Sequence, residues 1–365
     1  AIGLGQDQGH GSPPLRQVAT PILLPMGSHA SADWLLRYAR LARTVNAVRS
    51  YQSRPGIPGF TDGQSQDNMR SAIDLAPGAG KWISKRAVRQ SDPMAWQVAD
   101  FRASRFIPAD EVEKAVYGIR HNGFYVFDRV VDSSITDAIR SFAERAASTA
   151  RGLDLPAAPY PRQDPQVGRY DISEATALTC PEVQEFATDP AMAMIAQRYL
   201  GQPVLMDEVA FWWTTTKRAE DADLNAQLFH QDRDRLSFLK FFIYLTDVTP
   251  DSGPHVYLRG SHSDVPSSLR GDGRKSDDAV RAAGLWENVV ELTGPAGTIM
   301  AVDTIGLHKG KTPESADRLA LENEFSTTLF GADFERPSFE PSELVRDRYE
   351  QMPWVLQRYA EAVRS

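Results

Sequence analysis

The sequence predicts a protein that is mainly β with flanking helices, built around an antiparallel sandwich or barrel such as a jelly roll. Three observations lead to this class. Beyond residue 203, short β-prone runs follow one another with turns between them. No pattern for a crossover helix stands between these runs, which favours antiparallel over parallel pairing. The apolar content of 42% is sufficient for a real core.

Composition limits the class of protein. The 365 residues fit one large domain with extensions or two domains. There are 40 basic and 48 acidic residues, a net charge of −8 without a long run of either sign, so no nucleic-acid partner is expected. The single cysteine, Cys180, cannot form an internal disulfide, and we therefore expect a cytoplasmic location. No apolar run approaches the roughly 18 residues of a membrane span, and the start has no secretory pattern, so no membrane association is expected.

The first part of the chain is expected to be a mostly helical extension after a flexible start. Residues 1–31 contain several Gly and Pro and are either native or introduced by cloning. Apolar residues at helical spacing over residues 32–51 predict an amphipathic helix. Prolines and glycines over residues 55–59, and the polar residues 62–67, predict a loop. Residues 69–108 are expected to be an irregular packed segment, and the extension as a whole covers residues 32–115.

The middle of the chain alternates helices with one short strand. A helix is predicted from Pro108 to the Gly118–Gly123 region, because acidic residues occupy its first turn. Residues 124–127 then predict a strand, and residues 132–150 a helix with Ile135, Ile139 and Phe142 at helical spacing. Residues 156–165 are a Pro-rich loop. Residues 181–200 predict one more helix, which Gly201-Gln202-Pro203 ends.

The last part of the chain supplies the predicted strands and a closing helix. The β-prone runs cover residues 204–216, 236–246, 298–302 and 319–329, with turn residues at 250–254 and 294–297. A helical pattern returns over residues 343–364. We therefore expect a β domain over residues 116–335 and a C-terminal helix, within residues 336–365, that packs on it.

The triplet His230-Gln231-Asp232 is the first candidate for chemistry. In an extended segment, residues two positions apart project to the same face, which places an imidazole beside a carboxylate. A third ligand from a distant segment, such as His308, would complete a two-histidine, one-carboxylate set that suits Fe(II) and leaves positions open. In many proteins a lone His-x-Asp triplet is only a set of polar side chains on the surface. The order of motifs around it is more informative.

This order resembles the phytanoyl-CoA dioxygenase family of Fe(II)- and 2-oxoglutarate-dependent oxygenases. The resemblance runs from about Gly123 to about Phe330, and its landmarks are Phe229-His230-Gln231-Asp232, Ser252-Gly253-Pro254, Arg259-Gly260-Ser261-His262 and the segment from Gly297 through His308 to Arg318. It implies a double-stranded β-helix, which is a cupin-like jelly roll, over residues 116–335. It also implies iron held by His230, Asp232 and His308, with Arg318 on the distal carboxylate of 2-oxoglutarate, a group that the planar guanidinium can grip with two hydrogen bonds.

The implied reaction uses O2 and 2-oxoglutarate, releases succinate and CO2, and hydroxylates or otherwise oxidises a C–H bond of a small organic molecule. Related halogenases lack the carboxylate ligand, whereas Asp232 is present here. Two alternatives stay open: a jelly-roll metalloenzyme that uses Zn or Mn for isomerisation or hydrolysis, and a non-catalytic barrel that only binds its ligand. The N-terminal extension and the C-terminal helix could cover the barrel mouth or form a homodimer.

Further side chains are candidates for ligand contacts. The resemblance suggests that Phe242 faces the cavity, and period-two alternation then puts Lys240 and Tyr244 on the same side. A lysine there is costly unless it pairs with an anion, which makes Lys240 a candidate for 2-oxoglutarate or a substrate carboxylate, or else a strand-end lysine that reaches solvent. Better-known members often carry a hydroxyl residue at the position of Gly310. The remaining candidates are Thr312 for the cofactor, and His255 and Arg169, with Tyr244, for the substrate.

Overall fold

Two antiparallel sheets form the core of the computed structural model, which describes residues 32–53, 60–75, 78–88, 93–217, 226–271, 273–333 and 335–364. The predicted flexible start (residues 1–31) and the predicted loop at residues 55–59 lie outside these ranges. In spatial order the large sheet contains β1 (Phe124–Val126), β9 (Ile299–Val302), β6 (Phe238–Tyr244), β11 (Arg318–Ser326), β5 (Leu205–Thr214), β4 (Arg169–Ile172), β2 (Ala147–Ala150) and β3 (Ala158–Pro159). The small sheet contains β10 (His308–Gly310), β7 (His255–Leu258) and β8 (Val289–Leu292).

The two sheets pack face to face, as a jelly roll requires. Inward side chains of the large sheet, such as Phe242 and Met300, form one buried cluster with Tyr257 and Leu292 of the small sheet. Every strand pair is antiparallel. The predicted jelly-roll core is therefore confirmed. Helices nevertheless hold more of the described residues than strands do, so "mainly β" describes the core better than the whole chain.

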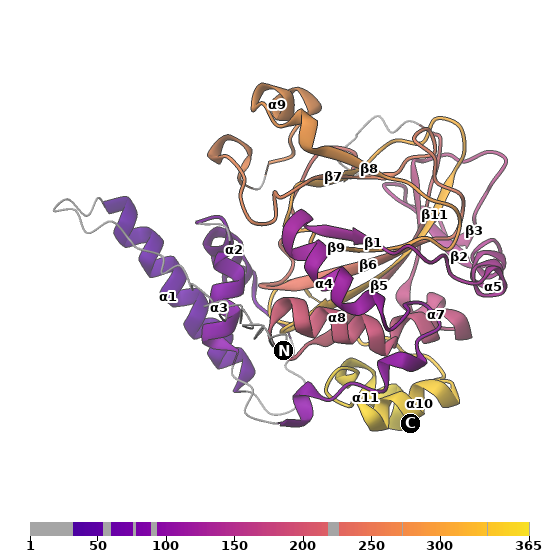
Figure 1. The fold of residues 1–365 in the computed structure, drawn as a ribbon, viewed down its shortest axis with the longest axis horizontal. Helices are drawn as coiled ribbons and strands as arrows, with labels where there is room; N and C mark the ends of the chain where they lie inside the picture. The colour runs from indigo at the N-terminus through magenta and orange to yellow at the C-terminus, as the bar shows by residue number, and fades with distance from the viewer. Residues whose placement is uncertain are drawn as a thin grey trace, which may run out of the picture.

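Helices cover the outer face of the large sheet (Figure 1). Side chains of β6 such as Phe241 and Ile243 point outward and pack against them. The helices of this part of the chain are α4 (Glu111–Asn122), α5 (Ser133–Ala143), α6 (Glu174–Ala177), α7 (Pro181–Ala187), α8 (Pro190–Leu200), α10 (Glu343–Gln351) and α11 (Ala360–Arg364). Helix α9 (Asp277–Ala282) lies next to the small sheet (Figure 1). Short 3-10 helices occur at Pro93–Trp96, Phe101–Ala103, Ser267–Leu269, Trp286–Asn288 and Gln357–Tyr359.

Three N-terminal helices stand beside the barrel: α1 (Ala32–Gln52), α2 (Gly63–Ile73) and α3 (Ala79–Ala87) (Figure 1). They have a core of their own, to which the barrel contributes Leu236, Leu329 and Phe330. Tyr51 of α1 meets Phe330 edge to face, with ring centroids 5.5 Å apart. Apolar burial therefore fixes these helices against the barrel.

The loop predicted over residues 62–67 is wrong, because α2 begins at Gly63. The segment is polar, and only Met69 and Ala72 of α2 are buried, so the apolar periodicity that marks a helix was weak. Asp62 starts the helix instead: its carboxylate accepts a 2.9 Å hydrogen bond from the backbone N–H of Ser65.

Two other helices are shorter than predicted. The helix expected over residues 132–150 ends at Ala143, and Ala147–Ala150 forms strand β2, the second strand from one edge of the large sheet. The helix expected over residues 181–200 is divided into α7 and α8, because Asp189 caps a new helix at Pro190. Strands β7, β8 and β10 and helix α9 were not predicted; each strand has only three or four residues.

Replacing Asp62 by alanine is expected to lower the free energy of unfolding by about 1 kcal/mol, a typical loss for an N-cap. The carboxylate satisfies the N–H of Ser65 and also accepts from its hydroxyl, and alanine can do neither. Urea unfolding of the variant against Asp67→Asn, an exposed carboxylate in the same helix, measures the difference. Equal midpoints for the two variants would contradict a capping role.

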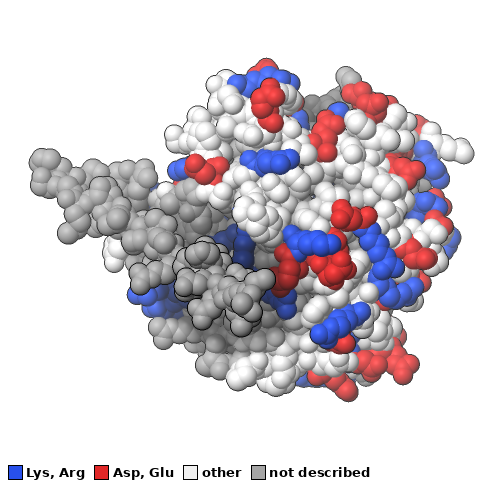
Figure 2. Space-filling view, in the orientation of Figure 1, with Lys and Arg blue, Asp and Glu red and all other residues white. Residues whose placement is uncertain are grey.

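The surface agrees with the charge pattern of the sequence. Figure 2 shows Lys and Arg side chains interspersed with Asp and Glu on this face, without a basic stripe. Among the described residues, no helix has the length and apolar character needed to cross a membrane.

Candidate metal centre

The backbone brings His230 and His308 together, although 78 positions separate them in the printed sequence. The N–H of His230 donates to the carbonyl of His308 at 2.9 Å, and the N–H of His308 donates back at 3.0 Å. This antiparallel bridge continues the small sheet beyond β10. The N–H of Asp232 donates to the carbonyl of Thr304 at 2.9 Å, which fixes Asp232 beside the segment that leads to His308.

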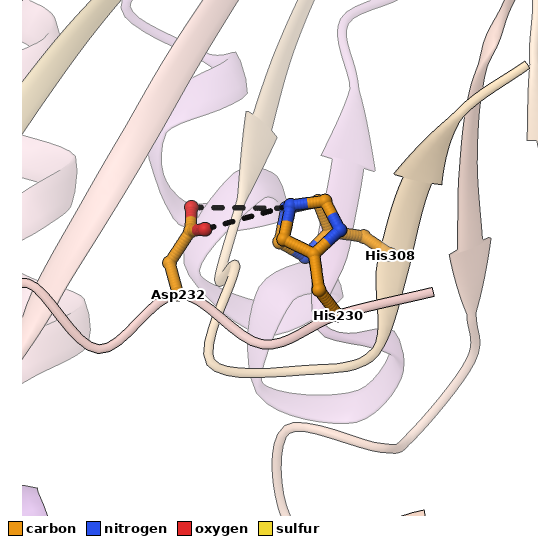
Figure 3. Close-up of side chains that lie close together, drawn as sticks. All are labelled: His230, Asp232 and His308. Atoms are coloured by element: carbon orange, nitrogen blue, oxygen red, sulfur yellow. Dashed lines mark ion pairs between the residues drawn. The ribbon is translucent and has the colours of Figure 1, made fainter. Parts of the chain in front are cut away.

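The side chains of these three residues converge (Figure 3). Nε2 of His230 lies 3.7 Å from Oδ1 of Asp232, and Nε2 of His308 lies 3.7 Å from Oδ2. One donor atom from each residue falls within 4.8 Å of the other two. Such a set can hold a divalent metal ion on one side and leave its other side open.

Both imidazoles are oriented for ligation through Nε2. Nδ1 of His230 lies 2.9 Å from the carbonyl oxygen of Leu228, and Nδ1 of His308 lies 3.0 Å from that of Gly306. A carbonyl oxygen can only accept, so Nδ1 carries the proton in each ring and Nε2 keeps its lone pair. A second hydrogen bond of this kind is usual for histidines that ligate metals.

The protonation states also suit a cation. Burial and the neighbouring His308 lower the pKa of His230 to about 3, and burial lowers the pKa of His308. Burial alone would raise the pKa of Asp232, but Lys240 and the two imidazoles hold it below its ordinary value. Near neutral pH the site therefore presents two neutral imidazoles and one carboxylate, the forms that bind metal.

A cavity of about 290 Å³ contains this set and most of the other predicted site residues. Along β11, Arg318 lies at one end and Glu322 further along the same inward face. The wall includes Trp212 and Phe242, whose rings meet edge to face at 6.4 Å. The predicted alternation of β6 is confirmed, because Phe242 lines the cavity while Phe241 and Ile243 face the helices.

Arg318 is buried in this cavity without a carboxylate partner among the described residues. Its Nη2 donates to the hydroxyl of Thr214 at 3.1 Å, its Nη1 donates to the carbonyl of Gly253, and its Nε has no partner. Burial lowers the pKa of the guanidinium. A buried cation in this state is costly until an anion reaches it.

Lys240 occupies the inward row as expected, and it is paired with protein carboxylates. Its Nζ lies 3.1 Å from Asp232, 2.9 Å from Glu322 and 3.4 Å from Glu324. Its role toward 2-oxoglutarate stays a prediction, while its present contact is with the carboxylate of a candidate ligand. Burial raises the pKa of Glu322 despite this pairing.

Two of the remaining candidates, His255 and Arg169, line the cavity. The ring of His255 is parallel to that of His308, with centroids 5.3 Å apart, and its buried Nε2 has no hydrogen-bond partner. Arg169 lines the cavity, lies 4.2 Å above the ring of Trp212 and pairs with Asp171 at 2.8 Å.

Two candidates lie outside the residues that line the cavity. The hydroxyl of Tyr244 donates to the carbonyl of Leu292 at 2.8 Å and accepts from the N–H of His255, so it holds β8 and β7 in place. Thr312 is half-buried on the chain beyond β10. The predicted ligand roles of both residues stay predictions.

Sequence reasoning missed several residues of the cavity. Thr214, Glu208, Asp234 and Glu322 line it, and none was a candidate. A signal existed for one of them, because Glu322 lies four positions after Arg318 along the predicted strand, and an even separation places the two side chains on the same face. Thr214 gave no signal, because its neighbour Arg318 comes from a strand 104 positions away.

Comparisons with known proteins bear on this geometry. A family model described as phytanoyl-CoA dioxygenase matches residues 119–319, a range that contains all three candidate ligands and Arg318. No curated protein matches the chain with significance.

Solved structures with similarity include the epimerase SnoN from nogalamycin biosynthesis in complex with Fe3+ and alpha ketoglutarate (18% identity, 59% of this chain and 83% of that chain, TM-score 0.43). HygX from Streptomyces hygroscopicus with nickel and 2-oxoglutarate bound has 18% identity over 63% of this chain and 92% of its own, with a TM-score of 0.40. EctD from S. alaskensis with bound Fe has 16% identity over 69% and 91%, with a TM-score of 0.43. These values make the three proteins distant, and the family match carries more weight.

Proposed function

The family match spans more than half of the chain, so this protein belongs to the phytanoyl-CoA dioxygenase family, and we propose that it hydroxylates, or otherwise oxidises, a C–H bond of a small organic molecule. Membership makes it an enzyme of the iron- and 2-oxoglutarate-dependent type. Iron and 2-oxoglutarate are its cofactors, which agrees with the three convergent donor atoms. A cytoplasmic location and a homodimer stay predictions.

One observation supports the proposal most strongly: an unpaired buried guanidinium shares a cavity with the candidate metal ligands. A metalloenzyme that only hydrolyses or isomerises has no need for Arg318 at this place. A dicarboxylate such as 2-oxoglutarate does need it, because one carboxylate can approach the metal while the other pairs with the arginine. The residues therefore fit the cofactor as well as the metal.

In the proposed mechanism, His230 and His308 would hold the metal through Nε2, and Asp232 would hold it through a carboxylate oxygen. Fe(II) with 2-oxoglutarate and O2 supplies the oxidising power, with succinate and CO2 as co-products. The protein itself binds and orients the substrate. The side chains of Trp212 and Phe242 exclude water from one wall of the cavity and limit where a substrate C–H bond can lie.

Arg318 and Thr214 are the proposed anchor for the distal carboxylate of 2-oxoglutarate. The guanidinium would donate two hydrogen bonds. The Thr214 hydroxyl accepts from Arg318, so its own proton is free to be donated to the same carboxylate. The hydroxyl of Thr214 would then take the place of the hydroxyl side chain that is missing at Gly310.

Metal removal tests the proposal. The wild-type protein with Fe(II), O2 and 2-oxoglutarate is expected to release succinate, and to lose this activity when a chelator removes the metal, because three side chains alone cannot activate O2. Re-addition of Fe(II) is expected to restore it, while Zn(II) is not. Succinate is measured by chromatography with mass detection. Succinate release that survives chelation, or none with Fe(II) at any 2-oxoglutarate concentration, would contradict the assignment.

A further inference from the structure

Two ion pairs connect the N-terminal helices to the segments that carry the candidate metal ligands. Helices α2 and α3 precede residue 119, where the family match begins. They stand beside α4 and α8 in Figure 1. A small cavity at their contact with the barrel is lined by Asp74, Gly80 and Lys81 on one side and by residues 231–233 on the other.

The first ion pair acts on the segment that carries His230 and Asp232. Asp74 follows α2, and its Oδ1 lies 2.9 Å from Nη2 of Arg233, with Oδ2 3.1 Å from Nη1. Arg233 is only 5% exposed and is the residue after Asp232. A buried guanidinium with two contacts to one carboxylate has little rotational freedom. The backbone at Asp232 is therefore tied to α2.

The second ion pair acts on the turn that leads to His308. Nζ of Lys81 in α3 lies 3.0 Å from Oδ2 of Asp303, which is fully buried, and 2.7 Å from the hydroxyl of Tyr199. The next residue, Thr304, accepts the N–H of Asp232. The carbonyl of Asp303 also accepts the N–H of Gly306 at 3.0 Å.

This turn orients a ligand directly. The carbonyl of Gly306 is the acceptor for Nδ1 of His308. The two contacts from the extension thus end one residue after Asp232, three after His230 and five before His308. In metal sites, groups that hold the ligands affect metal affinity although they do not touch the metal.

We propose that α2 and α3 position the metal centre through Asp74 and Lys81, so that the extension belongs to the active site although it lies outside the family match. This inference rests on the proposed function, since it concerns the same three ligands. It assigns a role to the acidic residue that follows α2 and to one lysine of α3. Neither residue touches the metal, and each acts through Arg233 or Asp303.

The test compares Asp74→Asn and Lys81→Met with controls on the same two helices, Asp67→Asn and Lys85→Met, whose side chains are exposed. The full-length protein is titrated with Co(II), and its visible absorption gives both the dissociation constant and the geometry of the site. The two test variants are expected to bind Co(II) about tenfold more weakly than the wild type, at the low end of the range for groups that hold ligands. The controls are expected to match the wild type.

Two variants of Arg233, the partner of Asp74, separate a positioning role from an effect on general stability. Arg233→Lys keeps a cation opposite Asp74 but not the planar fork, so its Co(II) affinity is expected to lie between those of the wild type and Arg233→Gln. Arg233→Gln is expected to lose affinity as Asp74→Asn does. Thermal unfolding without metal is recorded for every variant.

The outcomes decide between the possibilities. Unchanged Co(II) affinity in Asp74→Asn and Lys81→Met would overturn the positioning role, and so would a loss that appears only in variants that are unfolded without metal. A wild-type protein that binds Co(II) but makes no succinate would remove the proposed function and leave the positioning result intact.

Discussion

Replacing His230 by alanine is expected to weaken metal binding and to lower the rate of succinate formation by roughly a hundredfold or more, since even groups that only hold the ligands change affinity by about 10- to 100-fold. The change removes one of three donor atoms and leaves His308 and Asp232, which cannot enclose a metal from three directions. The backbone bridge to His308 uses no side-chain atom of His230 and should persist. Titration with Co(II) and the succinate assay measure the two effects.

A matched control is His121→Ala, because His121 is an exposed histidine that stacks on Tyr117 in α4. This variant is expected to keep wild-type activity. The His230 variant loses the hydrogen bond to the carbonyl of Leu228, so its free energy of unfolding should fall by about 0.5–3 kcal/mol, the usual range for a single change, and it should stay folded. Equal succinate turnover by the wild type and by His230→Ala would remove this histidine from the metal site.

The parts of the site that follow from local periodicity could be predicted from the sequence. His230 and Asp232 point to one side because they are two positions apart in an extended segment, and Phe242 faces the cavity for the same reason. The positions of His308 and Arg318 were implied by the family resemblance, because no local pattern links residues separated by such distances.

Contacts between distant segments could not be predicted. Lys240 signalled that an anion had to be near, but not that Asp232, Glu322 and Glu324 would all supply it. The start of helix α2 could not be predicted, because it depends on one carboxylate, Asp62, and not on apolar spacing. The pairing of Asp74 with Arg233 likewise depends on how the extension docks, which no short stretch of sequence encodes.

Replacing Arg318 by methionine is expected to raise the KM for 2-oxoglutarate roughly 10- to 150-fold, which corresponds to the about 1.5–3 kcal/mol typical of a hydrogen bond to a charged group. Methionine has no charge and matches the arginine side chain as far as Nε, so it removes the guanidinium and keeps the apolar stem in the wall of the cavity. Steady-state kinetics with varied 2-oxoglutarate at saturating Fe(II) measure the change. Co(II) affinity without 2-oxoglutarate should stay near the wild-type value, because Arg318 is not among the convergent donors.

Thermal unfolding gives a second and independent readout of the same arginine. On the proposed assignment, 2-oxoglutarate would supply the anion that the buried guanidinium lacks in the wild type, and a ligand that binds only the folded state raises the unfolding midpoint. Arg318→Met should lose this shift, yet it should be at least as stable as the wild type without 2-oxoglutarate, since the variant no longer buries an unpaired cation. Arg318→Lys keeps the charge but not the planar fork, so its midpoint shift with 2-oxoglutarate should lie between those of the wild type and Arg318→Met. A full 2-oxoglutarate shift in the methionine variant would mean that the dicarboxylate is held elsewhere, with Lys240 as one alternative cation among the residues that line the cavity.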